Sequence, residues 1–262
     1  MRADYHMHSR HSSDGSESVR AMFERAAELG LDEIAVTDHF DFDEAFLLYP
    51  NPVVAELARE IRSVQGRVPR VRFGAEVALK DAKAFEDALE YIGDQPIDLI
   101  IGSVHNTGGN DPYDAAFFEG RPREEAYADY LEHLAGRCVS ATGYSTLGHF
   151  DYVAKKAPYA QRTVRYLDNP DAFDRVFRHL AHNGIGIEIN TSVYRTSDEP
   201  MWGLDILQRF VELGGEFVTF GSDAHSAGRI GFRLEDAREL ARAAGVRYQA
   251  SFERMRPFLF PL

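Results

Sequence analysis

Residues 3–39 read ADYHMHSRHSSDGSESVRAMFERAAELGLDEIAVTDH, and this stretch contains a strand, a helix and a second strand in succession. The segment from Ser18 to Gly30 predicts a helix. It begins at Ser18, a favourable N-cap residue, carries apolar side chains at helical spacing and ends at Gly30. The apolar and β-branched run at 34–36 predicts a strand on the far side of that helix. Two strands joined by one helix favour a parallel pair with the helix packed across it.

The same alternation continues to residue 244. Runs rich in β-branched and aromatic residues predict strands at 3–8, 33–39, 70–79, 99–105, 146–151, 185–191 and 217–225. Amphipathic stretches predict helices at 18–29, 52–65, 80–92, 123–134, 170–182, 204–213 and 234–244. Such an alternation predicts an α/β protein, either a (β/α) barrel or a doubly wound sheet. No linker, repeat or low-complexity run divides the chain, so we expect a single domain over 1–262.

The composition narrows the class of protein. Hydrophobic residues make up 44% of the 262 residues, which is enough for one sizeable core. The net charge of −13 disfavours a general role in binding nucleic acid or anionic membranes. The one cysteine, Cys138, is expected to be a buried apolar residue in a reducing compartment. Because we find no signal-peptide pattern and no apolar run of membrane-spanning length, we expect a cytoplasmic protein.

Histidines and carboxylates gather where the predicted strands end. In chain order these residues are His6, His8, Asp14, His39, Glu76, His105, His149, Asp223 and His225. Any one histidine at a strand end is more often solvated or hydrogen-bonded than a metal ligand. Six of the ten histidines lie at these ends, however, and chance would scatter them over the helices too. The recurrence favours a metal site.

Strand geometry explains how these side chains could meet. His6 and His8 are two residues apart, as are Asp223 and His225, so each pair points to one side of its strand. In a barrel all the carboxyl ends of the strands converge on one face, where barrel enzymes place their active sites. Glu188, on the sixth strand, either faces the barrel interior or orients a ligand. The irregular stretches 41–51, 106–122 and 154–169 each follow a strand end and are expected to surround the site.

Several short motifs, taken together, resemble those of the PHP (polymerase and histidinol phosphatase) superfamily. They are Asp4-x-His6-x-His8, Thr37-Asp38-His39, Gly74-x-Glu76, Ser103-Val104-His105, Gly148-His149 and Ser222-Asp223-Ala224-His225. Their order and spacing further resemble the stand-alone histidinol-phosphate phosphatases of this superfamily. The resemblance implies a distorted, TIM-like (β/α)₇ barrel that holds three divalent transition-metal ions.

The resemblance also implies which residues hold each ion. A first ion would be bound by His6, His8, Glu76 and Asp223, a second by Glu76, His105 and His149, and a third by Asp14, His39 and His225. Mixed imidazole and carboxylate ligands suit Zn, Mn or Fe better than Ca. Three divalent ions among three carboxylates would leave about three positive charges, which would attract a phosphate ester despite the net negative chain.

The expected reaction is hydrolysis of a small phosphate monoester, L-histidinol phosphate, by hydroxide generated at the metal ions. Asp223 and His225 are the nearest groups that could supply a proton to the leaving alcohol. The phosphate is expected to be held by Arg195, with Arg162 and Arg165 as second choices and Lys155 and Lys156 after them. We expect a small-molecule substrate and no stable complex with nucleic acid.

Three other functions compete with this one. An amidohydrolase-type barrel also begins with His-x-His, but it would leave Asp14 and His39 without a role. A PHP module that stabilises a polymerase without catalysis is disfavoured, since every expected ligand is present. The closest alternative is a PHP phosphodiesterase or exonuclease that acts on nucleotides or short oligonucleotides.

Overall fold

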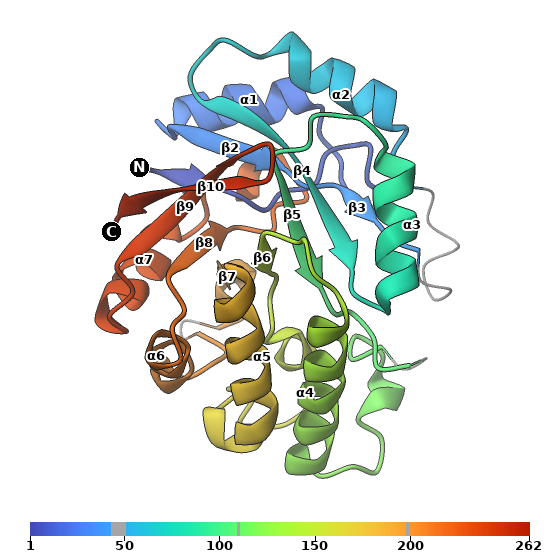
Figure 1. Ribbon diagram of the computed structural model, residues 1–262, viewed down its shortest axis with the longest axis vertical. Coiled ribbons are helices and arrows are strands. Elements are labelled where there is room, and N and C mark those ends of the chain that lie inside the picture. The colour runs from blue at the N-terminus through green and yellow to red at the C-terminus, as the bar shows by residue number, and fades with distance from the viewer. Residues whose placement is uncertain (43–50, 109–110, 198–199) are drawn as a thin grey trace.

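The computed structural model describes residues 1–42, 51–108, 111–197 and 200–262. A mostly parallel sheet forms the centre, and helices cover its outer side (Figure 1). Its strands are β1 (Ala3–Asp4), β2 (Glu33–Val36), β3 (His39–Phe40), β4 (Arg70–Ala78), β5 (Leu99–Ser103), β6 (Thr146–Leu147), β7 (Gly186–Asn190), β8 (Phe217–Gly221), β9 (Tyr248–Glu253) and β10 (Arg256–Pro261). The sheet runs β1-β2-β4-β5-β6-β7-β8-β9-β10, with β3 paired to β4. The predicted α/β class is confirmed.

Seven α-helices accompany these strands in the described residues. They are α1 (Val19–Glu28), α2 (Val54–Ser63), α3 (Ala82–Ile92), α4 (Arg123–Ser140), α5 (Pro170–Asn183), α6 (Leu204–Glu212) and α7 (Leu234–Ala243). Short 3₁₀ turns lie at Ala115–Phe117, Tyr152–Ala154, Tyr166–Asp168, Ser192–Arg195 and Ala227–Arg229. As expected, the Ser18 side chain caps α1 by accepting from the N–H of Ala21. No helix in the part of the chain that the structure describes is long and apolar enough to cross a membrane.

The two ends of the parallel sheet approach one another at the carboxyl ends of the strands. Tyr5 N–H donates to the Phe220 carbonyl at 2.8 Å, and His8 N–H donates to the Ala224 carbonyl at 2.8 Å. Met7 forms an isolated parallel bridge with Ala224. The segments that follow β1 and β8 therefore run side by side, in the manner of a barrel that is distorted at its seam.

A C-terminal hairpin fills the other end of this seam, and the sequence did not predict it. β9 pairs in parallel with the start of β8, and β10 returns antiparallel to β9. Phe252 packs edge-to-face against Tyr5 and against Phe217 inside the sheet. Gln249 Nε2 donates to the Met1 carbonyl at 2.8 Å, which places the two termini close together (Figure 1). β9 thus separates β1 from β8 at the amino ends of these strands.

Several predicted strands end earlier than expected. The strand at 3–8 is regular only at β1, 33–39 divides into β2 and β3, 99–105 ends at Ser103, 146–151 shortens to β6, and 217–225 ends at Gly221. The physical reason is that carboxylates replace ladder partners near these ends. Asp38 accepts from the N–H of Ser9 at 2.6 Å, and Glu188 accepts from the N–H of His149 at 2.9 Å. Side-chain acceptors of this kind satisfy the backbone while releasing it from the sheet.

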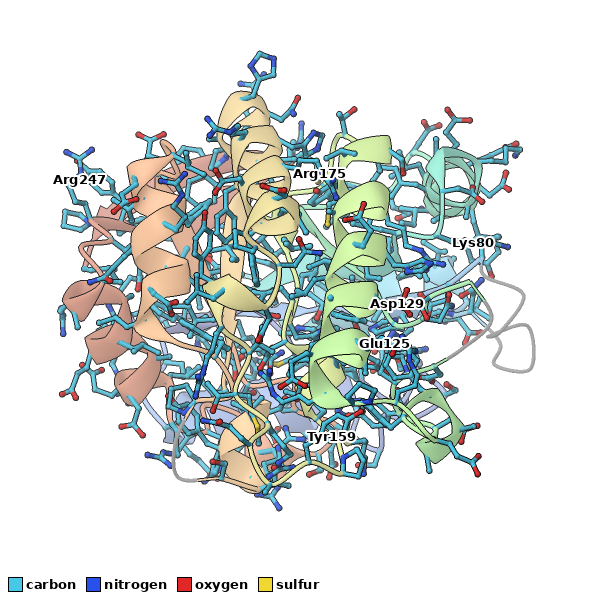
Figure 2. The ribbon with its side chains drawn as sticks, turned by 90° about the horizontal axis from the view of Figure 1, so that it is seen from below. Lys80, Glu125, Asp129, Tyr159, Arg175 and Arg247 are labelled. Atoms are coloured by element: carbon cyan, nitrogen blue, oxygen red, sulfur yellow. The ribbon has the colours of Figure 1, made fainter. Side chains whose placement is uncertain are left out.

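The outer helices bury one face and expose the other. Glu125 and Asp129 on α4 and Arg175 on α5 lie on the outside of the molecule (Figure 2). On the inner face, α4 continues six residues past its predicted end at 134, because Ala135 and Cys138 extend its buried stripe. Cys138 is fully buried as expected, and burial raises the pKa of its thiol to about 12.

Candidate metal centre

A cavity of about 330 Å³ opens at the carboxyl ends of the strands. Its lining comprises Ser13, Asp14, His39, Asp41, Asn51, Glu76, His105, Asp111, Tyr113, His149, Tyr152, Lys155, Asp223 and His225. The described ends of the three irregular stretches contribute to this wall, which agrees with their predicted position. Residues 43–50 of the first stretch and 109–110 of the second lie outside the described residues.

Glu76 is the carboxylate on which the buried histidines converge. Its Oε2 lies 3.2 Å from His6 Nε2 and 3.5 Å from His8 Nε2. His8 Nε2 also lies 3.4 Å from Asp223 Oδ1, so the four residues expected around a first ion are brought together. His6, His8 and Glu76 could hold one metal ion between their ligand atoms.

The other oxygen of Glu76 faces a second group. Oε1 lies 2.9 Å from His149 Nε2 and 3.3 Å from His105 Nε2, and it accepts from the Ser103 hydroxyl at 2.6 Å. Glu76, His105 and His149 could hold a second ion. The two oxygens of one carboxylate thus face two neighbouring clusters, as a bridging ligand requires.

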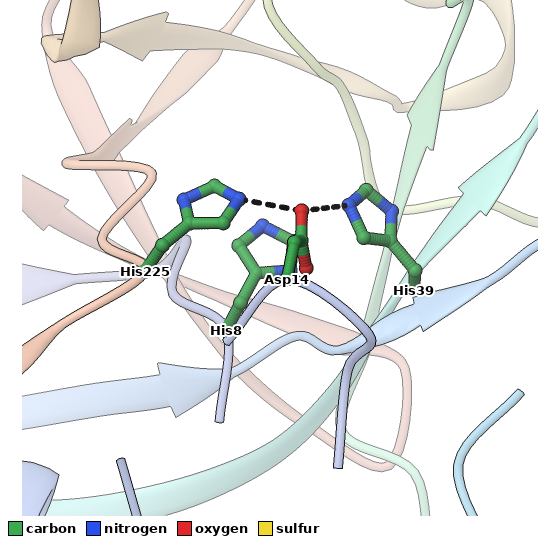
Figure 3. A group of neighbouring side chains, drawn as sticks. All are labelled: His8, Asp14, His39 and His225. Atoms are coloured by element: carbon green, nitrogen blue, oxygen red, sulfur yellow. Dashed lines mark hydrogen bonds and ion pairs between the residues drawn. The ribbon is translucent and has the colours of Figure 1, made fainter. Parts of the chain in front are cut away.

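A third group lies nearer to solvent (Figure 3). Asp14 Oδ2 is 2.8 Å from His225 Nε2 and 3.4 Å from His39 Nε2, and the two rings flank it. His8 joins this group, because its ring stacks at 4.4 Å on His39 and at 4.3 Å on His225. The structure therefore places His8 beside both the first and the third group, whereas the sequence assigned it to the first alone. His8, Asp14, His39 and His225 could hold a third ion.

The electrostatics of these groups favour a bound cation. Glu76 is buried, which opposes ionisation, yet His6 and His39 hold its pKa well below the usual range. Burial opposes a charge on His39 as well, but Glu76, Asp14 and Asp41 raise its pKa to about 10. In the absence of metal, protons on these histidines balance the charge of the carboxylates. A bound metal cation would displace those protons and balance the same charge. Burial and the neighbouring His39 lower the pKa of His8 to about 3, which leaves it a neutral ligand.

Ring nitrogens that make no hydrogen bond provide a further test of fit. Nε2 of both His6 and His8 is buried and has no hydrogen-bond partner among the described residues. These atoms lie close to Glu76 without hydrogen-bond geometry, as ligand atoms that share an ion do. The donor set therefore fits divalent metal ions.

Glu188 fixes the orientation of one of these histidines. Its Oε1 lies 2.7 Å from His6 Nδ1, which leaves Nε2 directed at Glu76. A carboxylate behind a ligating histidine sets both the ring tautomer and its orientation. Gly221 makes room for this contact, since a Cβ there would overlap Glu188 Oε1 and the Cβ of His6. Of the two roles that the sequence left open for Glu188, the structure favours the orienting one.

Two aspartates hold the segments that carry ligands. Asp4 accepts from both the N–H and the hydroxyl of Ser222, at 2.9 and 2.6 Å. Asp38 accepts from both the N–H and the hydroxyl of Ser9, at 2.6 and 2.7 Å. Asp4, at the end of β1, thereby fixes the segment after β8, next to Asp223. Asp38, just after β2, fixes the segment that leads from His8 to Asp14.

Of the five candidate phosphate-binding cations, Lys155 is the one that lines the cavity in the part of the chain that the structure describes. Arg195, Arg162, Arg165 and Lys156 are not among the described residues of its lining. Arg195 donates from Nη2 to the carbonyls of Ser222 and Asp223, at 2.8 and 2.7 Å, and so supports the segment that carries Asp223. Lys155, ranked low from sequence, lies in the cavity wall with Nζ 2.9 Å from Asp223 Oδ2. Its position six residues after His149, in the loop beyond a ligand, was the signal available in the sequence.

The sequence also missed an aromatic and acidic part of the wall. Tyr113 and Tyr152 stack with their centroids 4.8 Å apart, and the Tyr152 ring lies 5.1 Å from that of His105. Asp111 lies beside them and accepts from the N–H of Tyr113 at 2.7 Å. Asp41, which lies 3.4 Å from His39 Nδ1, adds a second carboxylate to the wall. None of these residues belongs to a motif that the sequence singled out.

Comparison with known proteins gives consistent matches. A family model described as "PHP domain" matches residues 4–192. The histidinol-phosphatase of Lactococcus lactis subsp. lactis (strain IL1403) is 31% identical over 257 residues, which cover 97% of this chain and 95% of that protein. A crystal structure of histidinol phosphate phosphatase from the same strain, complexed with Zn, L-histidinol and phosphate, has a TM-score of 0.88 at 30% identity and 98% coverage of both chains. The DNA polymerase/3'-5' exonuclease PolX of Bacillus subtilis (strain 168) is 25% identical over 206 residues, covering 74% of this chain and 34% of that protein.

Proposed function

Because this chain belongs to the PHP domain family, we propose that it hydrolyses L-histidinol phosphate to L-histidinol and phosphate at a centre of three divalent transition-metal ions. The class of enzyme is a phosphoric monoester hydrolase. The observation that carries the proposal is the set of three neighbouring histidine and carboxylate groups at one cavity, two of them joined through Glu76. The full-length similarity to a histidinol-phosphatase supports the choice of substrate.

The proposed ligands follow the three groups. His6, His8, Glu76 and Asp223 would hold the first ion, Glu76, His105 and His149 the second, and Asp14, His39 and His225 the third, with His8 shared between the first and the third. Imidazole and carboxylate ligands suit Zn, Mn or Fe, and the similar crystal structure contains Zn. Divalent ions so held would lower the pKa of water and neutralise charge on the phosphoryl oxygens.

The chain's own residues would position the ester. Lys155 presents a cation to the cavity, and Arg195 rigidly supports the backbone of Ser222 and Asp223 from behind. Both would favour the negative charge of a bound phosphate over a neutral ligand. Asp223 and His225 remain our candidates for handling the proton of the leaving alcohol, since both line the cavity.

The aromatic and acidic part of the wall suits the organic part of this substrate. L-Histidinol phosphate carries an amine and an imidazole, both of which accept protons. Asp41 and Asp111 supply carboxylates there, and Tyr113 and Tyr152 supply aromatic faces that attract cations. A cavity lined by a cation, carboxylates and aromatic rings fits an ester that is itself anionic at one end and cationic at the other.

A substrate panel tests this proposal against the nuclease alternative. Phosphate release from L-histidinol phosphate should exceed that from nucleoside monophosphates, and phosphodiesters such as short oligonucleotides should be poorer still. The reason is that a diester carries one charge less and has no terminal phosphate group for the ion cluster. A preference for a diester over every monoester tested would overturn the phosphatase proposal.

Asp14→Ala and His39→Ala should each release the third ion while leaving two bound. Turnover is expected to fall by about a hundredfold, the scale of losing a few kcal/mol of charge stabilisation. Both residues lie at the mouth of the cavity, so the fold should persist. Metal analysis of the purified variants and their circular dichroism spectra check this. Unfolding of both variants would mean that the residues are structural.

Arg195→Ala should reduce kcat/KM by roughly 2–4 kcal/mol of transition-state stabilisation. The guanidinium donates to two carbonyls at once, so its loss would loosen the segment that carries Asp223. Arg195→Lys should recover only part of the loss, because an ammonium lacks the planar fork. Steady-state kinetics on L-histidinol phosphate measure both variants, and equal activity of Arg195→Ala and the wild type would remove this residue from the site.

A further inference from the structure

A second cavity, of about 340 Å³, lies at the amino end of β4, away from the metal centre. Arg70 stands at the first residue of β4 and Glu76 six residues further along the same strand. At about 3.3 Å per residue, the two cavities are separated by roughly 20 Å. Helix α2 forms one wall of this second cavity, and the turn between β9 and β10 contributes another.

Cationic side chains dominate its lining. Arg62, Arg70, Arg72 and Arg254 contribute four guanidiniums, against the carboxylates of Asp98 and Glu253. Asp98 is already engaged, since it accepts from the N–H groups of Phe73 and Arg254 at 3.0 and 3.1 Å. A local excess of positive charge in a protein of net charge −13 calls for an explanation.

Three of these guanidiniums have no anionic partner within the described ranges. No ion pair or side-chain hydrogen bond involves the guanidiniums of Arg62, Arg70 or Arg254 among residues 1–42, 51–108, 111–197 and 200–262, and all three residues are exposed. Arg178, an exposed arginine elsewhere on the surface, lies 3.2 Å from Asp174 on its own helix. Arg62, Arg70 and Arg254 are thus free to bind an external anion.

Arg72 extends this cationic surface into the protein. Arg72 is nine-tenths buried, and its Nη2 lies 3.0 Å from Glu33 Oε2. The hydroxyl of Ser251 also donates to Glu33, at 2.6 Å, so the guanidinium is held in place. Arg72 Nη1 also lies 3.6 Å from Oε2 of Glu253, so this guanidinium has two carboxylate partners and forms a fixed edge of the cavity beside the three unpaired arginines.

Apart from Gln65, whose Nε2 donates to the Val71 carbonyl at 2.6 Å, the rest of the lining is apolar. Ala58 and Ile61 from α2, Val71 and Phe73 from β4 and Pro96 supply hydrocarbon surface beside the arginines. A fully hydrated inorganic ion would not use this surface, whereas an anion with an apolar body would. We propose that this cavity is a second binding site, which takes a small organic anion. Its carboxylate, sulfonate or phosphate group contacts the arginines, and its hydrocarbon body packs on Ala58, Ile61 and Val71.

The test uses the metal-loaded enzyme and the fluorescent aromatic sulfonate 1-anilinonaphthalene-8-sulfonate. Fluorescence should saturate at one probe per chain, and Arg62→Ser and Arg70→Ser should each weaken the Kd by about tenfold, as expected for the loss of one charged hydrogen bond. Both arginines are exposed, so the fold should survive. Arg67→Ser is the matched control, because Arg67 is also exposed, lies between these two residues in sequence and does not line the cavity.

Competition adds a second readout. Benzoate should displace the probe, whereas benzyl alcohol, which has a similar body without the charge, should not. Binding that survives in the Arg62→Ser/Arg70→Ser double variant would overturn the proposal, as would an equal effect of Arg67→Ser or the absence of saturable binding. Because neither arginine lies near the metal centre, failure here leaves the proposed phosphatase function untouched.

Discussion

Glu76→Ala should lose nearly all phosphatase activity and at least two of the proposed metal ions. One oxygen of Glu76 faces His6 and His8, and the other faces His105 and His149. Removing the side chain therefore takes a ligand from two groups and leaves their histidines without the carboxylate that joins them. Loss of several kcal/mol of charge stabilisation corresponds to a fall in kcat/KM of about a thousandfold or more.

Matched variants separate the charge from the shape of Glu76. Glu76→Gln keeps the side-chain volume and should still lose metal, because an amide is a weaker ligand than a carboxylate. Glu86→Ala, an exposed glutamate on α3, should keep both metal and activity. Elemental analysis and steady-state kinetics on the same preparations give both quantities. If Glu76→Ala kept its metal content and its turnover, Glu76 could not be a bridging ligand.

Lys155→Met should reduce kcat/KM by about a hundredfold to a thousandfold, with the loss largest for doubly charged monoesters. The Lys155 side chain is nine-tenths buried, lies in the cavity wall and pairs with Asp223 through its ammonium group. Burial opposes its charge, but Asp223 and Tyr113 together keep the pKa of Lys155 above its usual value, so it stays cationic. A buried cation beside a developing phosphate charge stabilises the transition state on the scale of one oxyanion donor.

Two further variants make the Lys155 result specific. Lys155→Arg keeps the charge and should recover part of the activity, whereas a purely structural role would not distinguish charge from volume. Lys83→Met, on the exposed face of α3, should behave as the wild type. Unchanged kinetics for Lys155→Met would mean that Lys155 does not stabilise the phosphate and that the proposed metal ions do so without it.

The parts of the site that sequence predicted best are those fixed by strand periodicity. His6 and His8, two residues apart, do face the same carboxylate, and every histidine found at a predicted strand end lies in one of the three groups. The period of two is a local property of the backbone, so it can be read without knowledge of the rest of the fold. The parallel direction of the strands likewise follows from the alternation of strands and helices.

What the sequence failed to predict depends on long-range packing. β9 follows α7 and joins β8 as a further parallel strand, whereas β10 returns antiparallel without a helix. The position of both strands is set by contacts with the first residues of the chain, such as those of Gln249 with Met1 and Phe252 with Tyr5. Of Arg162 and Lys155, only Lys155 lines the cavity. The sequence could not show this, because the path of a loop decides which of its residues turns inward.

The most direct test is a metal titration of the chelator-treated protein, followed by phosphate release from L-histidinol phosphate. The account predicts no turnover without metal, activity that rises as divalent transition ions are added, and saturation at about three ions per chain. It also predicts that Asp14→Ala saturates at two ions with much lower turnover. Full activity in the metal-free protein, saturation at a single ion, or no phosphate release from this substrate at any loading would contradict it.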